Sequence, residues 1–181
     1  MILAASQADG PALANSTVAT SILHASGKCT LQAGALQVGS TIKHTIHGRI
    51  STVVTTPGTL TFDLRLNGIV VSALGALNLN TTAQTNSAFE LILLTTIRAL
   101  GTGTGAQAFV TGVFTSRALV GSPAVTAGSA GTCMLPDTAP AVGVNGFDST
   151  LALPMDVFAT WSIANASNSS QVHQSVAEIK V

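Results

Sequence analysis

Apolar and polar residues alternate along much of the chain, most regularly between residues 58 and 73. Side chains of an extended strand point to alternate faces, so the apolar residues of 60–66 share one face and the polar residues share the other. Asn67 and Gly68 follow, and both tolerate the positive φ that a two-residue hairpin turn requires. This stretch predicts a hairpin with one dry face. Its expected register pairs Leu66 with Ile69, Leu64 with Val71 and Phe62 with Ala73.

The same alternation predicts further strands. Over residues 41–54 the apolar face would carry Ile42, His44, Ile46, Gly48, Ile50, Thr52 and Val54. Over residues 155–163 Trp161 alternates with the apolar set, so we expect its side chain to be buried. The segment 88–100 is apolar on both faces except at Glu90 and Arg98. A strand of this kind is covered on both faces, so it is predicted to be central or to lie at a subunit contact.

Together with further strands over 17–24, 29–33, 106–119 and 171–181, these segments give about eight strands separated by turns. This pattern predicts an all-β fold, an antiparallel β-sandwich that is jelly-roll-like. Residues 1–16 show neither period and are interpreted as an extended N-terminal arm, with residues 17–181 as the jelly-roll domain. Residues 121–146 also lack a period. Loops of this length are often functional, so we interpret them as a binding loop.

Charge limits the partners that the chain can have. Seven basic and seven acidic residues give a net charge of zero, and charged residues are only 8% of the sequence. The chain therefore lacks the basic field that holds nucleic acid or an anionic membrane, and no direct contact with either is expected. Near-zero net charge favours association. We therefore expect a homo-oligomer whose neutral surface packs against other chains.

Histidines and glycines that could suggest chemistry have simpler structural explanations. His44 and His47 are three residues apart in a predicted strand, so their rings point to opposite faces and cannot bind one metal ion. His24 and His173 are isolated in the sequence. The glycines at 101, 103 and 105 lack the strand-to-helix context of a phosphate-binding loop and are predicted to form a hairpin loop. Metal and phosphate sites are therefore not expected.

The acidic residues are also explained without catalysis. Asp148 precedes Ser149 and Thr150 as a turn or cap residue does, and Asp156 alternates onto the polar face of its strand. Two pairs, Asp63 with Arg65 and Glu90 with Arg98, are interpreted as surface or interface ion pairs. No G-x-S-x-G elbow supplies a nucleophile. The sequence predicts a protein that is not an enzyme, with no catalytic, cofactor-binding or metal-binding residues and no cofactor.

Four segments carry a resemblance to a known family: QVGSTIKHTIHGRISTVVTTPGTLTFDLRL (37–66), FELILLTTIRALGTGT (89–104), GVFTSRALVGSP (112–123) and GFDSTLALPMDVFATWSIANASNS (146–169). Across residues 35–181 the chain resembles structural proteins of tailed bacteriophages of the jelly-roll type. The resemblance implies a virion component made in the host cytoplasm, foremost a trimeric cement or decoration protein that contacts the major capsid protein at the capsid surface.

The alternative implied by the resemblance is a tail-associated β-sandwich that binds a host receptor or glycan. Sugar sites usually stack an aromatic ring on the ligand and surround it with polar groups. The chain has six Phe, one Trp and no Tyr, and Trp161 alternates with the core residues. An aromatic sugar platform is therefore poorly supplied, and the sequence favours the head protein.

Overall fold

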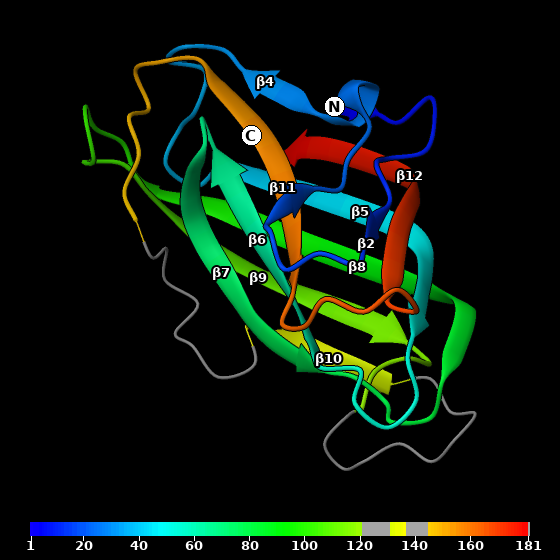
Figure 1. Cartoon of the computed structure of the whole chain (residues 1–181). Coiled ribbons are helices and arrows are strands. Elements are labelled where there is room, and N and C mark those ends of the chain that lie inside the picture. Colours follow the sequence, from blue (N-terminus) through cyan, green and yellow to red (C-terminus); the bar gives the residue numbers. More distant parts are fainter. Residues whose placement is uncertain (121–130, 137–144, 181) are drawn as a thin grey trace.

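A computed structural model describes residues 1–120, 131–136 and 145–180. These residues form two antiparallel β-sheets that face each other, with seven strands in one sheet and five in the other (Figure 1). A single turn of 3-10 helix, Ala25–Gly27, is the one helix in the described part of the chain. Within these residues no helix has the length and apolar character needed to span a membrane. The predicted β-sandwich is confirmed.

The larger sheet contains, in order across it, β1 (Ile2–Ala5), β12 (Ser169–Lys180), β5 (Thr41–Thr52), β8 (Gln84–Ala99), β9 (Gln107–Ser116) and β10 (Gly131–Leu135), while β2 (Leu13–Ala14) also pairs with β12. The smaller sheet contains β3 (Thr20–Ser21), β11 (Leu153–Trp161), β6 (Thr59–Leu66) and β7 (Ile69–Asn78), while β4 (Cys29–Leu31) also pairs with β11.

Strands that are distant in sequence form the centre of each sheet. Strand β12 pairs with β5, and β11 pairs with β6, so the second half of the chain folds back over the first in a nested way that is typical of jelly rolls. In contrast, β8, β9 and β10 follow one another as neighbours in one sheet. The fold therefore combines nested pairing at its centre with a three-stranded meander at one side.

The core fills the space between the two sheets. Along β5 every second residue is buried, from Ile42 to Thr52, as the alternation predicts. Trp161 is fully buried, and its indole Nε1 donates to the Leu13 carbonyl oxygen at 3.4 Å, so the prediction for Trp161 is confirmed. Val54 was expected on the same face, but β5 ends at Thr52 and Val54 is 56% exposed. Alternation stops predicting burial where the strand ends.

The β6–β7 hairpin has the expected turn but a different register. Leu66 pairs with Ile69, as predicted. The next pairs are shifted, because Leu64 lies opposite Ser72 and Asp63 lies opposite Ala73. The predicted partners of Leu64 and Phe62 are therefore wrong. An irregularity in the ladder adds a residue to β7 between its pairs with Leu64 and Arg65, and alternation alone gives no sign of such an insertion.

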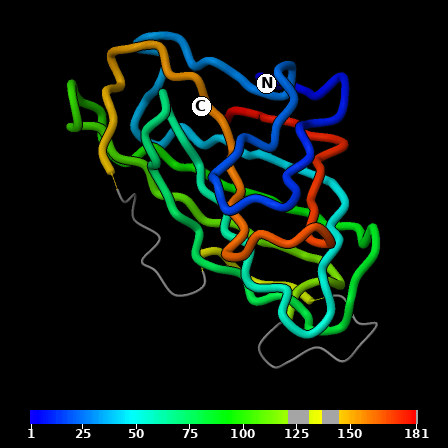
Figure 2. The backbone as a smooth tube through the Cα atoms, viewed as in Figure 1, coloured from blue at the N-terminus to red at the C-terminus, as the bar shows by residue number. Residues whose placement is uncertain are grey.

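Two segments without a sequence period also enter the larger sheet. Within the expected loop, residues 131–135 form β10 and pair with β9, while residues 121–130 and 137–144 lie outside the described part. The N-terminal segment 1–16 is extended and lies beside β12, the red strand next to the blue start of the chain (Figure 2). It contributes Leu13, only 2% exposed, to the core. These short strands form by pairing with a longer neighbouring strand, so their own sequences need not alternate between apolar and polar residues.

Candidate functional site

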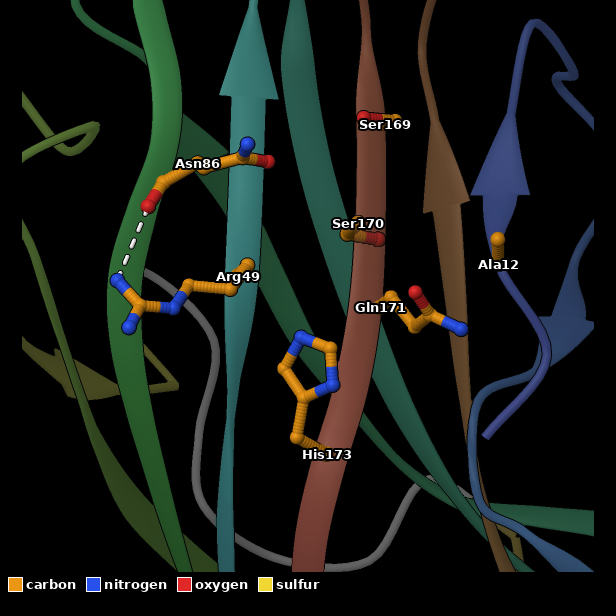
Figure 3. A pocket seen from close by; sticks show the side chains of 7 residues that line it. All are labelled: Ala12, Arg49, Asn86, Ser169, Ser170, Gln171 and His173. Carbon is orange, nitrogen blue, oxygen red and sulfur yellow. Dashed lines mark hydrogen bonds between the residues drawn. The ribbon is translucent and has the colours of Figure 1, made fainter. Parts of the chain in front are cut away.

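A polar groove of about 570 Å³ lies on the outer face of the seven-stranded sheet, where β5, β8 and β12 meet the N-terminal segment (Figure 3). Most of its lining side chains are polar. The lining residues are Ala12, Arg49, Asn86, Ser169, Ser170, Gln171 and His173. Arg49 and Gln171 are cross-strand partners, so they stand side by side on the outer face. We call this feature the polar groove.

A β-bulge in β12 places His173 at the groove. Val172 pairs with Gly48 and Gln174 pairs with His47, so His173 is the extra residue between these two pairs. A bulge re-aims the side chains of the strand that carries it. The ring of His173 stands between the side chains of Arg49 and Gln171 (Figure 3). The bulge therefore adds an imidazole to a sheet face that already carries a guanidinium and an amide.

A second irregularity, in β8, places Asn86 on the other side of Arg49. Ile50 pairs with Ser87 and Thr52 pairs with Gln84, so two residues of β8 lie opposite Ser51. Asn86 has a φ of 48°, a left-handed conformation that asparagine tolerates better than most residues. Its N–H donates to Ser51 Oγ at 3.0 Å, and its carbonyl oxygen accepts from Arg49 Nη1 at 3.1 Å. The distorted backbone of β8 therefore holds the Arg49 guanidinium in place.

The N-terminal segment forms the remaining wall. Gly10 N–H donates to the Val172 carbonyl oxygen at 2.8 Å, and its own carbonyl oxygen accepts from Gln171 Nε2 at 3.1 Å. A Cβ atom on Gly10 would lie 1.9 Å from the Ile22 carbonyl oxygen, so the chain can pass here only with glycine. Beside it, an Asp9 carboxylate oxygen lies 3.0 Å from His173 Nδ1. This contact leaves Nε2 of His173 available to the groove.

The groove combines the Arg49 guanidinium, which only donates, with amide, hydroxyl and imidazole groups that both donate and accept. In the described residues the Arg49 guanidinium uses one of its N–H groups, toward Asn86, and the side chain is exposed. None of the lining residues is acidic, and the nearby Asp9 carboxylate is engaged by His173. Guanidinium groups bind carboxylates through paired N–H donors, while amide and hydroxyl groups bind sugar hydroxyls. The groove can therefore hold a hydroxyl-rich ligand, and an anionic group on it would meet the Arg49 guanidinium, which forms no ion pair among the described residues.

Histidines 44 and 47 point to opposite faces of β5, as their spacing predicts. His44 is 1% exposed, and burial lowers its pKa to about 4. Its Nε2 has no hydrogen-bond partner among the described residues. His47 lies on the outer face, with Nε2 3.9 Å from a Glu90 carboxylate oxygen. No group of three or more His, Cys, Asp or Glu residues in the described ranges could hold a metal ion.

Asp148 stabilises the loop that joins β8 to β9. Its Oδ1 accepts from both the hydroxyl and the N–H of Thr150, and its Oδ2 accepts from Gly103 N–H at 2.8 Å. These hydrogen bonds, the Thr150 hydroxyl foremost, lower the pKa of Asp148. The glycines at 101–105 thus form a hairpin loop, as predicted. Asp156 is engaged elsewhere, by Lys28 Nζ at 2.7 Å and by the Ser21 hydroxyl at 3.0 Å.

One of the two predicted ion pairs forms. Arg65 Nε contacts Asp63 Oδ1 at 2.6 Å, and the Arg65 guanidinium also covers the Phe158 ring at 3.8 Å. The pair of Glu90 with Arg98 is wrong, because the Arg98 guanidinium lies 4.4 Å from the centre of the Phe109 ring and Glu90 faces His47. Eight residues separate Glu90 from Arg98 along a strand, a distance of about 27 Å, too long for an ion pair.

The groove itself was not expected from the sequence. Alternation puts Arg49 on the polar face of its strand, with Lys43, Thr45, His47 and Ser51, and His173 is isolated in the sequence. The two residues come together only through the pairing of β5 with β12 and the bulge at His173. The one available signal was the polar face of residues 43–51, which alternation does identify but does not connect to β12.

Neither a comparison with models of protein families nor a comparison with curated proteins finds a match. Among solved structures, the chain is similar to the CBM2 module of the evolved Dit of Lactobacillus casei BL23 phage J-1. The two share 14% sequence identity with a TM-score of 0.34, over 85% of this chain and 69% of that one. A likeness at this level adds no argument about the fold or the groove, which are described above from this chain alone.

Proposed function

We propose that this protein is a non-catalytic, tail-associated β-sandwich of a phage virion that binds a glycan carrying carboxylate groups in the polar groove. The observation that carries the proposal is the Arg49 guanidinium. Its unused donors face a groove lined by amide, hydroxyl and imidazole groups and by no acid. A ligand with both hydroxyl and carboxylate groups matches this set of donors and acceptors.

The size and lining of the groove support a saccharide ligand. A volume of about 570 Å³ lies within the ordinary range of small-ligand sites, about 300–1,000 Å³. Among the described lining residues there is no Phe, Tyr or Trp, so binding would rest on hydrogen bonds and charge rather than on stacking against one of these rings. Such a site suits recognition of repeated, weakly bound units on a surface, where many copies of the protein act together.

The virion setting rests on the sequence resemblance to tailed-phage structural proteins. Within that setting, a head cement role would use the N-terminal arm and the 121–146 loop to reach neighbouring subunits. Most of that loop lies outside the described residues. Part of the arm is built into the sandwich, because β1 and β2 pair with β12 and Leu13 is buried in the core. We therefore favour the ligand-binding tail component, with other virion subunits as its partners.

Binding is tested by titrating purified protein with tri-galacturonic acid and with its methyl ester, which keeps the hydroxyls and loses the charge. We expect the acid to bind and the ester to bind more weakly. Because hydrogen bonds to charged groups contribute about 1.5–3 kcal/mol, Arg49→Gln should weaken binding of the acid by roughly 10- to 100-fold. Arg98→Gln, on the same sheet face but at the other end of β8, is the matched control and should change nothing.

Equal binding by the Arg49→Gln and Arg98→Gln variants would remove the groove from the proposal. Location is tested separately, by cryo-electron microscopy of phage particles labelled with gold-conjugated antibody against this protein. We expect label at the tail. Label over the head instead would transfer the protein to the decoration class, whatever the groove binds.

A further inference from the structure

We infer that a second copy of this chain packs face to face on the outer side of the seven-stranded sheet, around a two-fold axis that runs between β12 and β5. The observation is one row of outward side chains across four neighbouring strands. Ile2 of β1 pairs with Glu178 of β12, Glu178 with Lys43 of β5, and Lys43 with Leu94 of β8. We call these four residues the palindromic row. This inference is independent of the proposed ligand.

The apolar ends of the palindromic row, Ile2 and Leu94, are exposed, and the two charged residues between them are partly exposed. Ile2 is 64% and Leu94 is 42% exposed, two of the larger apolar side chains left in solvent. Neither Lys43 nor Glu178 forms an ion pair within 4.0 Å among the described residues. Beside them lies a shallow hollow of about 390 Å³, lined by Gly39, Thr41, Lys43, Leu94, Glu178 and Lys180. An apolar side chain from outside could enter it.

The order apolar, acidic, basic, apolar is complementary to itself. Consider a two-fold axis that is parallel to the strands and lies above the gap between β12 and β5. It places β12 of one copy over β5 of the other copy, and β1 of one copy over β8 of the other. Lys43 then lies over Glu178 of the partner subunit, and Ile2 lies over Leu94 of the partner subunit. Isologous contacts of this kind bring the same patch of each copy together. All four side chains therefore gain a suitable neighbour from one operation.

Other positions of the axis fail on charge. An axis above β5 would place Lys43 over the same lysine of the partner, and an axis above β12 would oppose the two copies of Glu178. An axis between β5 and β8 would bury Lys43 against Leu94 of the partner subunit. Like charges brought together across an interface repel each other, and an unpaired buried charge is also unfavourable. Among axes parallel to the strands, only the one between β12 and β5 satisfies the palindromic row.

The next row along the strands is compatible with the same axis. Ala5 pairs with Val176, Val176 with Thr45, and Thr45 with Ile92. The axis places Ala5 over Ile92 of the partner subunit and Val176 over Thr45 of the partner subunit. No charge enters this row, so it adds apolar contact without a penalty. The two rows form a patch about 20 Å wide, since strands lie about 4.8 Å apart.

A patch of this size predicts a weak dimer. Specific interfaces that bury little surface are at the transient end of the known range. We therefore expect a micromolar dissociation constant and a dimer that forms at high protein concentration. This differs from the trimer expected from the sequence, because a self-complementary patch closes with two copies. Arg49 is six residues from Lys43 along β5, about 20 Å, so the dimer contact and the polar groove can be altered separately.

A charge exchange tests the axis directly, with mass measured by sedimentation equilibrium of the full chain over a concentration series. Wild-type protein should approach twice 18.1 kDa at the highest concentrations. Lys43→Glu alone, or Glu178→Lys alone, opposes like charges and should raise the dissociation constant by at least about tenfold. The double variant carries opposite charges at the two positions again, so dimerisation should return toward the wild-type value.

Arg117→Glu is the matched control, because it makes the same charge change on an exposed residue just beyond β9, outside both rows. It should leave the dissociation constant unchanged. Circular dichroism and the urea midpoint identify any variant that fails to fold, and the single Glu178→Lys variant replaces Lys43→Glu in that case. A wild-type monomer at all concentrations, a trimer mass, or a double variant no better than its single parents would each overturn the inference.

Discussion

The two faces of the seven-stranded sheet are organised in different ways. The inner face is mostly apolar: residues such as Ile46, Leu91 and Phe114 are fully buried, and His44 is buried among them with a few serines and threonines. The outer face is divided along its length. One end carries the polar groove around Arg49, and the palindromic row with its apolar neighbours lies about 20 Å away. One sheet thus presents a mostly apolar surface to the core and two distinct surfaces to solvent.

The difference follows from what each face must do. A core requires only that its side chains be apolar and fill space, so one apolar residue can replace another of similar volume with little loss of stability. A binding surface requires particular groups at particular places, so register and bulges decide its composition. The irregularities beside Ser51 and at His173 lie at the groove, where they re-aim side chains without disturbing the inner face.

The largest effect expected from this comparison is on stability. Phe114 and Val113 are neighbours on β9 that point to opposite faces, and Phe114 is fully buried. The Phe114 ring centre lies 5.5 Å from that of Phe62 and 5.6 Å from that of Phe89. Phe114→Ala should lower the free energy of unfolding by about 3–5 kcal/mol, through lost burial and the cavity left behind.

Val113→Ala is the matched change on the outer face and should cost about 0.5 kcal/mol or less. Urea denaturation followed by tryptophan fluorescence measures both variants, because Trp161 is buried in the folded state. Similar losses for Phe114→Ala and Val113→Ala would show that the two faces do not differ in the way described.

A smaller effect concerns pH and His44, which lies on the inner face between Leu93 of β8 and Ala177 of β12. Burial lowers its pKa from 6.5 to about 4, so the unfolded chain binds a proton between these values that the folded chain does not. The contribution of neutral His44 to the free energy of unfolding is therefore fully present above pH 6.5 and decreases as the pH falls toward 4. Below pH 4 the protonation of His44 lowers the free energy of unfolding no further. The full loss is on the order of 3 kcal/mol.

The His44→Leu variant replaces the imidazole with an apolar side chain of similar size and so removes the titrating group. The free energy of unfolding of this variant should fall less than that of the wild type between pH 6.5 and 4, and the difference between the two curves isolates His44 from the carboxylates. Parallel curves for the two proteins would show that the His44 ring is hydrated in the folded state.

Alternation predicted the inner face well and the outer face poorly. The buried set of β5 and the buried Trp161 follow from side-chain direction alone, since the core selects for apolar type. The polar groove does not follow from side-chain direction alone. It needs the pairing of Arg49 in β5 with Gln171 in β12, and these two residues are 122 positions apart in sequence. Pairing between distant strands is set by the packing of the whole sandwich.

Local irregularities account for most of the remaining differences. The added residue in β7 shifted the partners of Leu64, and the bulge in β12 placed both His173 and Gln174 on the outer face. A β-bulge inserts one extra residue into a strand, and no particular residue type marks the inserted position. A single sequence therefore does not reveal it. The short strand β10 is hidden because its sequence, GTCML, does not alternate: Met134 is apolar and yet 65% exposed.

The smallest expected effect concerns Arg98, on the outer face near the end of β8. The sequence suggested a pair with Glu90, whereas the structure places the Arg98 guanidinium 4.4 Å from the centre of the Phe109 ring. A cation above an exposed aromatic ring contributes about 0.5–1 kcal/mol. In a double-mutant cycle, Arg98→Gln and Phe109→Leu should therefore show a coupling of about 0.5 kcal/mol in urea denaturation.

The same cycle with Glu90→Gln in place of Phe109→Leu should give no coupling to Arg98, since Glu90 faces His47 and lies several residues away along the strand. Added salt separates the two interactions further, because it screens exposed ion pairs more than contact with a ring. A salt-sensitive coupling of Arg98 to Glu90 would restore the pair that the sequence suggested. Coupling to Phe109 alone would instead show that a charged residue on this outer face is stabilised by an aromatic residue of the neighbouring strand. The coupling free energy would be roughly a tenth of the unfolding free energy lost on Phe114→Ala at the inner face.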